Sequence, residues 1–396
     1  MPTSPDAERA ALPTPTKPRR IDSLDLLRGL VMIVMALDHT RDYFSNADFD
    51  PTDLSKTNAA LFLTRLVTHF CAPTFVLLAG ISAFLYGNKR TNRKDLSWFL
   101  FSRGVWLILL EVTLVHWGWS FDVSGHSITG QVIWAIGVSM VVLAGLVWLP
   151  TSAILAFGLT MIAGHNLLDG IQPHSREAQS VLWKIVHTGG PIEFAPHHTF
   201  FVLYPVVPWI GIMAAGYALG AVYLWPAERR RQFLLRLGAG LLLAFLLVRG
   251  LNVYGDPHRW TVQPSPLFTL FSFVNCQKYP PSLDYILMTL GPACLALAVL
   301  EQVKGKFASI AVTYGRVPMF YYLLHVPLIH ALAIVFAVIQ YGKTAALFTP
   351  ANPPPGYPLF VVYLVWITIV ASLYLPCRWF AGVKARHRDK PWLSYL

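Results

Sequence analysis

The residues from Ser23 to Phe44 read SLDLLRGLVMIVMALDHTRDYF. The middle of this stretch is an unbroken apolar run, and charged residues stand toward both of its ends. A helix needs about 20 mostly apolar residues to cross a bilayer, so the stretch has the length of a membrane span. Charged side chains inside a span are costly unless they are paired or hydrated, and each one is therefore a candidate for function.

The whole chain has a composition that agrees with this stretch. Of its 396 residues, 55% are hydrophobic and 13% are charged, against about 25% charged residues in ordinary soluble domains. The mean hydropathy is +0.51. A soluble globule would lack polar surface, whereas lipid can solvate the apolar excess. The sequence therefore predicts an all-α polytopic membrane protein.

Ten runs along the chain are long enough to cross a bilayer, which predicts a bundle of about ten transmembrane helices. The ninth run contains Pro318 and Pro327, so we expect it to be kinked or broken. The runs cover residues 23–43, 59–87, 96–117, 128–149, 151–168, 200–225, 233–254, 283–303, 310–341 and 357–377.

Lysine and arginine are divided unevenly between the two sides of this bundle. With the N-terminus inside, the cytoplasmic segments hold nineteen of them and the opposite side holds seven. The positive-inside rule therefore predicts that both termini face the cytoplasm. The same division accounts for the formal net charge of +11 and excludes a nucleic-acid partner as its cause.

We expect three parts along the chain. Residues 1–22 are polar and proline-rich without the apolar core of a signal peptide, which predicts a disordered cytoplasmic tail. Residues 23–377 form the membrane domain, and residues 378–396 form a basic cytoplasmic tail. The four cysteines form no CxxC motif and the sequence has no HExxH, so no metal is expected.

Polar residues crowd into the last turns of the first run, where Asp38, His39, Arg41 and Asp42 follow one another closely. Residues three apart share a helix face. Asp42 can therefore orient the imidazole of His39, as a general base requires, and Asp38 can neutralise Arg41. The alternative is an interfacial cluster of ion pairs that only ends the helix.

Ionisable residues also stand inside other runs, namely Arg65, His69, Glu111 and His325. Each is either a hydrogen-bonded contact between helices or, together with His39, part of one cavity in the outer half of the bundle.

A second group of charges lies a turn or two inside the cytoplasmic boundaries and consists of Arg28, Arg103, Arg236 and Arg316. Either each of these arginines reaches out to the lipid headgroups, or several share a cavity and bind phosphate groups there. Arg28 and Arg316 are the strongest candidates. Each stands beside a glycine, Gly29 or Gly315, that lets a backbone or a ligand come close.

Three stretches together resemble a family of transmembrane acyltransferases. This family contains the catalytic domain of heparan-α-glucosaminide N-acetyltransferase and its YeiB-like bacterial relatives. The stretches are RIDSLDLLRGL (20–30), which is followed by DHTRDYF, then YPVVPWIGIMAAGYALG (204–220) and GRVPMFYYLLH (315–325). The resemblance covers residues 20–380, nearly the whole chain.

The resemblance implies a transferase of a bacterial inner membrane. Acyl-CoA, expected to be acetyl-CoA, is the donor on the cytoplasmic side, and Arg28, Arg316 and Arg103 are the candidates to bind its phosphates. The acceptor is an amino or hydroxyl group of a sugar or glycan on the far side. His39 is the nearest match to the first-span motif, although Asp38–His39 stands where the animal enzyme has an Asn, and His325 matches the histidine of the late motif.

Other interpretations stay open at this point. A polytopic transporter or flippase would use the intramembrane His and Arg residues as a path for protons or anions. N-acylation and O-acylation share the donor and differ only in the acceptor atom, and the sequence is compatible with a homodimer.

Overall fold

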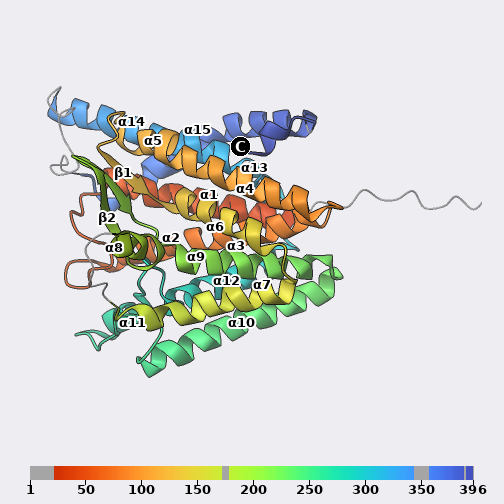
Figure 1. Cartoon of the computed structure of the whole chain (residues 1–396). Helices are drawn as coiled ribbons and strands as arrows, with labels where there is room; N and C mark the ends of the chain where they lie inside the picture. The colour runs from red at the N-terminus through yellow and green to blue at the C-terminus, as the bar shows by residue number, and fades with distance from the viewer. Residues whose placement is uncertain (1–21, 172–177, 343–355, 388, 396) are drawn as a thin grey trace, which may run out of the picture.

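The computed structural model describes residues 22–171, 178–342, 356–387 and 389–395. Figure 1 shows a bundle of helices with a small sheet at one end, beside α8. The tail predicted for residues 1–22 lies outside the described residues except for Asp22, where the first helix begins. The last long helix continues as far as Arg386, inside the segment predicted as a tail.

The helices follow the predicted runs closely. Their bounds are α1 Asp22–Phe44, α2 Ala59–His69, α3 Cys71–Gly87, α4 Arg93–Leu110, α5 His116–Ser120, α6 Val132–Leu146, α7 Thr151–Gly164, α8 Ala178–Trp183, α9 Val206–Leu219, α10 Ala227–Leu251, α11 Pro266–Val274, α12 Leu283–Leu300, α13 Lys306–Arg316, α14 Pro318–Tyr341 and α15 Leu359–Arg386. A π turn, Glu111–Val115, joins α4 to α5.

Eight continuous helical segments in the described part of the chain are long and apolar enough to cross a membrane. The predicted number of about ten also counts α1 and α6, which are not among these eight segments. Helix α6 has 15 residues and is short for a span. Helix α1 has 23 residues, but it carries charged side chains near both ends. The structure thus agrees with the predicted bundle of membrane-spanning helices, but it does not confirm the predicted number of spans.

The ninth predicted run is broken, as its prolines indicated. Helix α13 ends at Arg316 and α14 begins at Pro318, because a proline fits the first turn of a helix but not its interior hydrogen bonding. Pro327 stays inside α14.

Residues 200–205 are not helical, although they belong to the sixth predicted run. The strand β3, His198–Val202, pairs in parallel with β1, Ser127–Gly130, and antiparallel with β2, Gly190–Ala195. The resulting three-stranded sheet has the order β1-β3-β2. Strands β2 and β3 come from the long segment between α7 and α9, and Pro205 marks the point where α9 can begin. Strand β1 takes up residues 128–130 of the fourth predicted run, so the helix of that run begins only at Val132.

Helix α1 crosses α13 at very short range. A Cβ on Gly29 would lie 1.7 Å from the carbonyl oxygen of Ala311, and a Cβ on Gly315 would lie 1.8 Å from that of Asp25. Only glycine permits this approach. Both glycines therefore admit a neighbouring backbone, and the crossing fixes the positions of Arg28 and Arg316 beside them.

Candidate functional site

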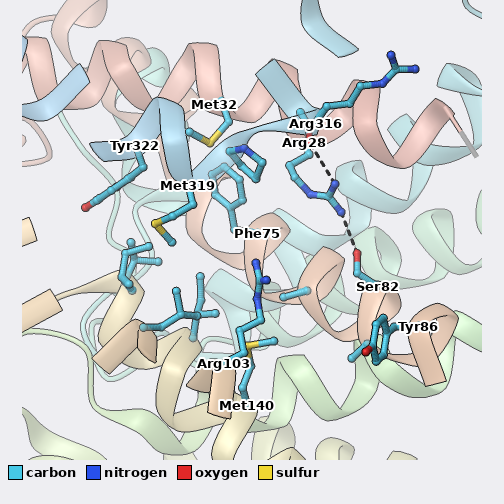
Figure 2. Close-up of a pocket in the computed structure, with 18 of the residues that line it drawn as sticks. Arg28, Met32, Phe75, Ser82, Tyr86, Arg103, Met140, Arg316, Met319 and Tyr322 are labelled. Carbon is cyan, nitrogen blue, oxygen red and sulfur yellow. Dashed lines mark hydrogen bonds between the residues drawn. The ribbon is translucent and has the colours of Figure 1, made fainter. Parts of the chain in front are cut away.

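A cavity of about 350 Å³ opens between α1, α3, α4, α6 and α14. The three predicted arginines Arg28, Arg103 and Arg316 all line it, together with Lys384 of α15. Figure 2 shows Arg28 and Arg103 facing the same space, with Tyr322 at the end away from Arg316. Arg236, the fourth arginine of the predicted group, is not among the residues that line it. Four cationic side chains around one cavity are suited to an anionic ligand such as a phosphate ester.

Arg28 is held in place by three helices. Its guanidinium donates to Asp25 Oδ1 of α1 at 2.9 Å, to the carbonyl oxygen of Gly315 at 3.2 Å and to Ser82 Oγ of α3 at 2.8 Å. The predicted Asp25–Arg28 pair is thus present. Arg316 is less constrained, because its side chain is 43% exposed and its Nη2 lies 3.8 Å from Asp22.

The cavity continues along one face of α1. Arg28, Met32 and Met35 line it, and these positions belong to the series i, i+4, i+7 on one helix face. The next member of the series, i+11, is His39. Eleven residues of α-helix rise about 16 Å in about three turns. His39 therefore lies on the same face as Arg28, above the cavity.

Helix α14 has the same arrangement. Pro318 and Tyr322 line the cavity, and the next position on that face is His325. The two stripes meet, because Nδ1 of His39 lies 2.8 Å from Nε2 of His325 and the two rings are stacked. The cavity thus leads from the cationic side chains toward a pair of buried histidines.

The hydrogen bonds of this pair fix its tautomers. Nδ1 of His325 lies 3.0 Å from the carbonyl oxygen of Tyr321, which can only accept, so this nitrogen carries the proton. Nε2 of a neutral His325 is then an acceptor, and His39 donates to it from Nδ1. The remaining lone pair of the two rings is on Nε2 of His39, which is the arrangement of an oriented general base.

Asp38 anchors the helices behind His39. Its carboxylate accepts two bonds of 2.8 Å from Arg65 of α2 and one of 2.7 Å from Thr68, and Arg41 lies 2.7 Å away. Nζ of Lys278 lies 3.9 Å from the same carboxylate. The predicted Asp38–Arg41 pair is present, within a larger buried cluster.

The geometry corrects the predicted role of Asp42. We expected this carboxylate to orient His39 from three residues away. It accepts instead from Nη2 of Arg41 at 2.6 Å and is 43% exposed, while His325 holds the imidazole of His39. A contact between two helices, made by histidines 286 residues apart in sequence, thus replaces the local contact.

The other ionisable residues inside the spans take separate positions. Glu111 accepts from the backbone nitrogen of Trp134 at 2.8 Å and so caps the start of α6. The backbone oxygen of His69 accepts from the hydroxyl of Tyr285. Neither residue, nor Arg65, is among those that line the 350 Å³ cavity. The residues that line this cavity therefore do not confirm the prediction that Arg65, His69 and Glu111 share one cavity with His39.

Several residues of the site were not predicted. Ser82, Lys384 and Tyr322 line the cavity, and Trp119 packs edge-on against His39 with ring centroids 4.8 Å apart. A signal for Tyr322 was present, because it stands one helical turn before His325 in the late motif. Among the described residues no group of three or more His, Cys, Asp or Glu side chains has a geometry that could hold a metal ion.

Comparison with known proteins identifies a family for the chain. No curated protein matches the chain. The sequence profile described as heparan-α-glucosaminide N-acetyltransferase, catalytic, matches residues 20–254, which is more than half of the 396 residues. The match includes Arg28, Asp38, His39 and Arg103, while Arg316 and His325 lie beyond it. The chain therefore belongs to the family of the heparan-α-glucosaminide N-acetyltransferase catalytic domain.

Proposed function

We propose that this acetyltransferase moves an acetyl group from acetyl-CoA, bound from the cytoplasm, to an amino or hydroxyl group of a sugar or glycan on the other side of a bacterial inner membrane. In this proposal the end of the bundle with Arg28 and Arg316 faces the cytoplasm, and the sheet faces outward. The excess of lysine and arginine in the segments assigned to the inside supports this orientation.

The observation that carries the proposal is the pair of stripes on α1 and α14. Each begins near an arginine, follows the wall of one cavity and ends at a histidine of the bonded pair. The rise from Arg28 to His39 is about 16 Å. A donor suited to this arrangement joins anionic phosphates to a reactive carbonyl through a long, narrow arm, and acyl-CoA has that construction.

In the proposed reaction, Nε2 of His39 takes the proton of the acceptor amine or hydroxyl group. The acceptor nitrogen or oxygen then forms a bond to the thioester carbonyl carbon. When the carbon–sulfur bond breaks, the sulfur leaves as the CoA thiolate and receives the proton from His39. His325 keeps the tautomer of His39 correct throughout and stabilises its positive charge by accepting from Nδ1.

Transfer is tested with purified protein, radiolabelled acetyl-CoA and a panel of amino sugars and envelope glycans. His39→Ala should lose about 10²–10⁴-fold in kcat while it still binds acetyl-CoA, because general-base catalysis contributes about that factor. His126→Ala is a matched control, since His126 directly precedes β1 of the sheet and does not line the cavity. A wild-type protein that transfers nothing to any acceptor, or a fully active His39→Ala variant, would refute the proposal.

Orientation is tested separately with single cysteines in a cysteine-free background. Cysteines at Asn92 and Glu228 should be shielded from an impermeant thiol reagent in intact cells, and cysteines at Asp48 and Ser124 should react. All four native side chains are exposed, so accessibility reports the side of the membrane. The opposite labelling pattern would place the donor cavity outside.

A further inference from the structure

The end of the cavity next to the histidine pair is formed by a tyrosine of α14. Tyr322 lines the cavity and is only 3% exposed. Its ring meets both histidines edge-on, with centroids 6.0 Å from His39 and 5.3 Å from His325. Figure 2 shows its hydroxyl directed away from the arginines. The phenol therefore borders both the cavity and the histidine pair.

The hydroxyl oxygen of Tyr322 already accepts a hydrogen bond. Indole Nε1 of Trp119 donates to it at 3.4 Å, and an indole nitrogen can only donate. The phenolic proton is thus directed elsewhere, and no acceptor for it is recorded within the described ranges. A hydroxyl that accepts one hydrogen bond becomes a stronger donor of the next.

The histidines have no comparable donor to offer. Nδ1–H of His325 is taken by the carbonyl oxygen of Tyr321, and its Nε2 accepts from His39. Nε2 of His39 must be unprotonated to act as the base. In the resting pair, neither ring therefore presents a hydrogen-bond donor to a carbonyl oxygen in the cavity, whereas the hydroxyl of Tyr322 has a proton that it can donate.

We propose that Tyr322 is a catalytic residue whose hydroxyl donates a hydrogen bond to the thioester carbonyl oxygen of the donor. The inference rests on the proposed acetyl transfer. As the acceptor adds to the carbonyl carbon, the electron pair of the C=O bond moves to this oxygen, and the O–H of Tyr322 stabilises the resulting oxyanion. When the C=O bond re-forms and the C–S bond breaks, the phenol has neither gained nor lost a proton.

The first test compares Tyr322→Phe with a matched variant. Removing one oxyanion donor costs about 10²–10³-fold in kcat, so Tyr322→Phe should lose that factor while its Kd for acetyl-CoA stays within about twofold of wild type. Tyr223→Phe removes another buried hydroxyl, one that is not among the residues lining the cavity, and should leave kcat unchanged. A Tyr322→Phe variant with wild-type kcat overturns the proposal, and so does one whose activity loss is explained by lost binding.

The second test does not depend on turnover. Acetonyl-CoA replaces the thioester by a stable ketone, and its carbonyl stretch can be isolated by ¹³C labelling in difference infrared spectra. Bound to wild type, this band should move to lower frequency than in Tyr322→Phe. Equal frequencies in the two proteins would overturn the role of Tyr322 even if acetyl transfer occurs. A shifted band in a protein that transfers no acetyl group would instead refute the proposed function and leave the contact intact.

Discussion

Helix α1 carries the same kind of ion pair near each end, and the two pairs have different surroundings. Asp25 and Arg28 are three residues apart and 2.9 Å from each other, as Asp38 and Arg41 are three apart and 2.7 Å from each other. The side chain of Arg28 is 17% exposed and borders the cavity, whereas that of Arg41 is 4% exposed. Spacing along a helix therefore predicts pairing, while the neighbours decide whether a ligand can reach the pair.

The Asp38–Arg41 pair belongs to a cluster in which several cations share one carboxylate, whereas in the Asp25–Arg28 pair one arginine has several acceptors. Arg41, Arg65 and Lys278 all surround the single carboxylate of Asp38. At the cavity end, Arg28 is divided between a carboxylate, a hydroxyl and a backbone oxygen. The first arrangement suits the joining of helices, and the second keeps a cation at the edge of a binding space.

The largest effect is expected at Asp38. Asp38→Asn leaves three buried cations without their shared anion, and breaking a buried pair costs about 3–5 kcal/mol. Thermal unfolding in detergent should show a large fall in Tm, with a smaller fall for Asp25→Asn at the other end of α1. Equal losses in the two variants would contradict the difference between the two ends.

The next effect concerns the cavity. Arg316→Gln and Arg103→Gln should each weaken acetyl-CoA binding by roughly tenfold to a hundredfold, because a charge-assisted hydrogen bond contributes about 1.5–3 kcal/mol. Isothermal titration of the purified variants measures this directly. Arg236→Gln is the control, since Arg236 belongs to the same predicted group but does not line the cavity. Equal weakening in all three would indicate a general effect of positive charge.

A smaller effect is expected for Asp42. Its carboxylate is 43% exposed and pairs only with Arg41 among the contacts found for it, and exposed ion pairs contribute about 0–1 kcal/mol. Asp42→Asn should therefore reduce kcat less than about fivefold, with no change in the pH profile of the reaction. A loss near that of His39→Ala would restore Asp42 as the group that orients the imidazole.

The smallest effect concerns a contact between a histidine and a carboxylate outside α1. His187 Nε2 lies 3.1 Å from Asp169, and burial holds the pKa of this imidazole below its usual value although the carboxylate opposes the shift. The unfolded chain then binds the proton more readily, so the stabilising contribution is present above about pH 6.5 and is lost as the pH falls below it. Tm should decline on acidification, and the decline should be weaker in His187→Gln. Identical pH dependence in both proteins would exclude this contribution.

The sequence predicted those parts of the site that depend on local geometry. The pairs Asp25–Arg28 and Asp38–Arg41 and the break before Pro318 follow from helix periodicity and proline stereochemistry. The three arginines around the cavity were found because a charge inside an apolar run is costly without a reason.

Contacts between helices could not be predicted in the same way. The His39–His325 bond and the approach of Lys278 to Asp38 depend on how each helix is rotated about its axis. That rotation is set by packing, as at the Gly29–Gly315 crossing, where several apolar faces compete with similar energies. A sequence lists the residues of each face but does not say which faces meet.

The continuity of α1 has a consequence for how this protein can change over generations. Arg28 and His39 belong to one unbroken helix, so deleting or inserting one residue between them would turn the imidazole by about 100° and move it by about 1.5 Å along the axis. Such a change would part His39 from His325 without altering any residue of the site. Length variation among descendants should accordingly be excluded from residues 28–39 and concentrate in the connections at the sheet end, where no helical register would be disturbed.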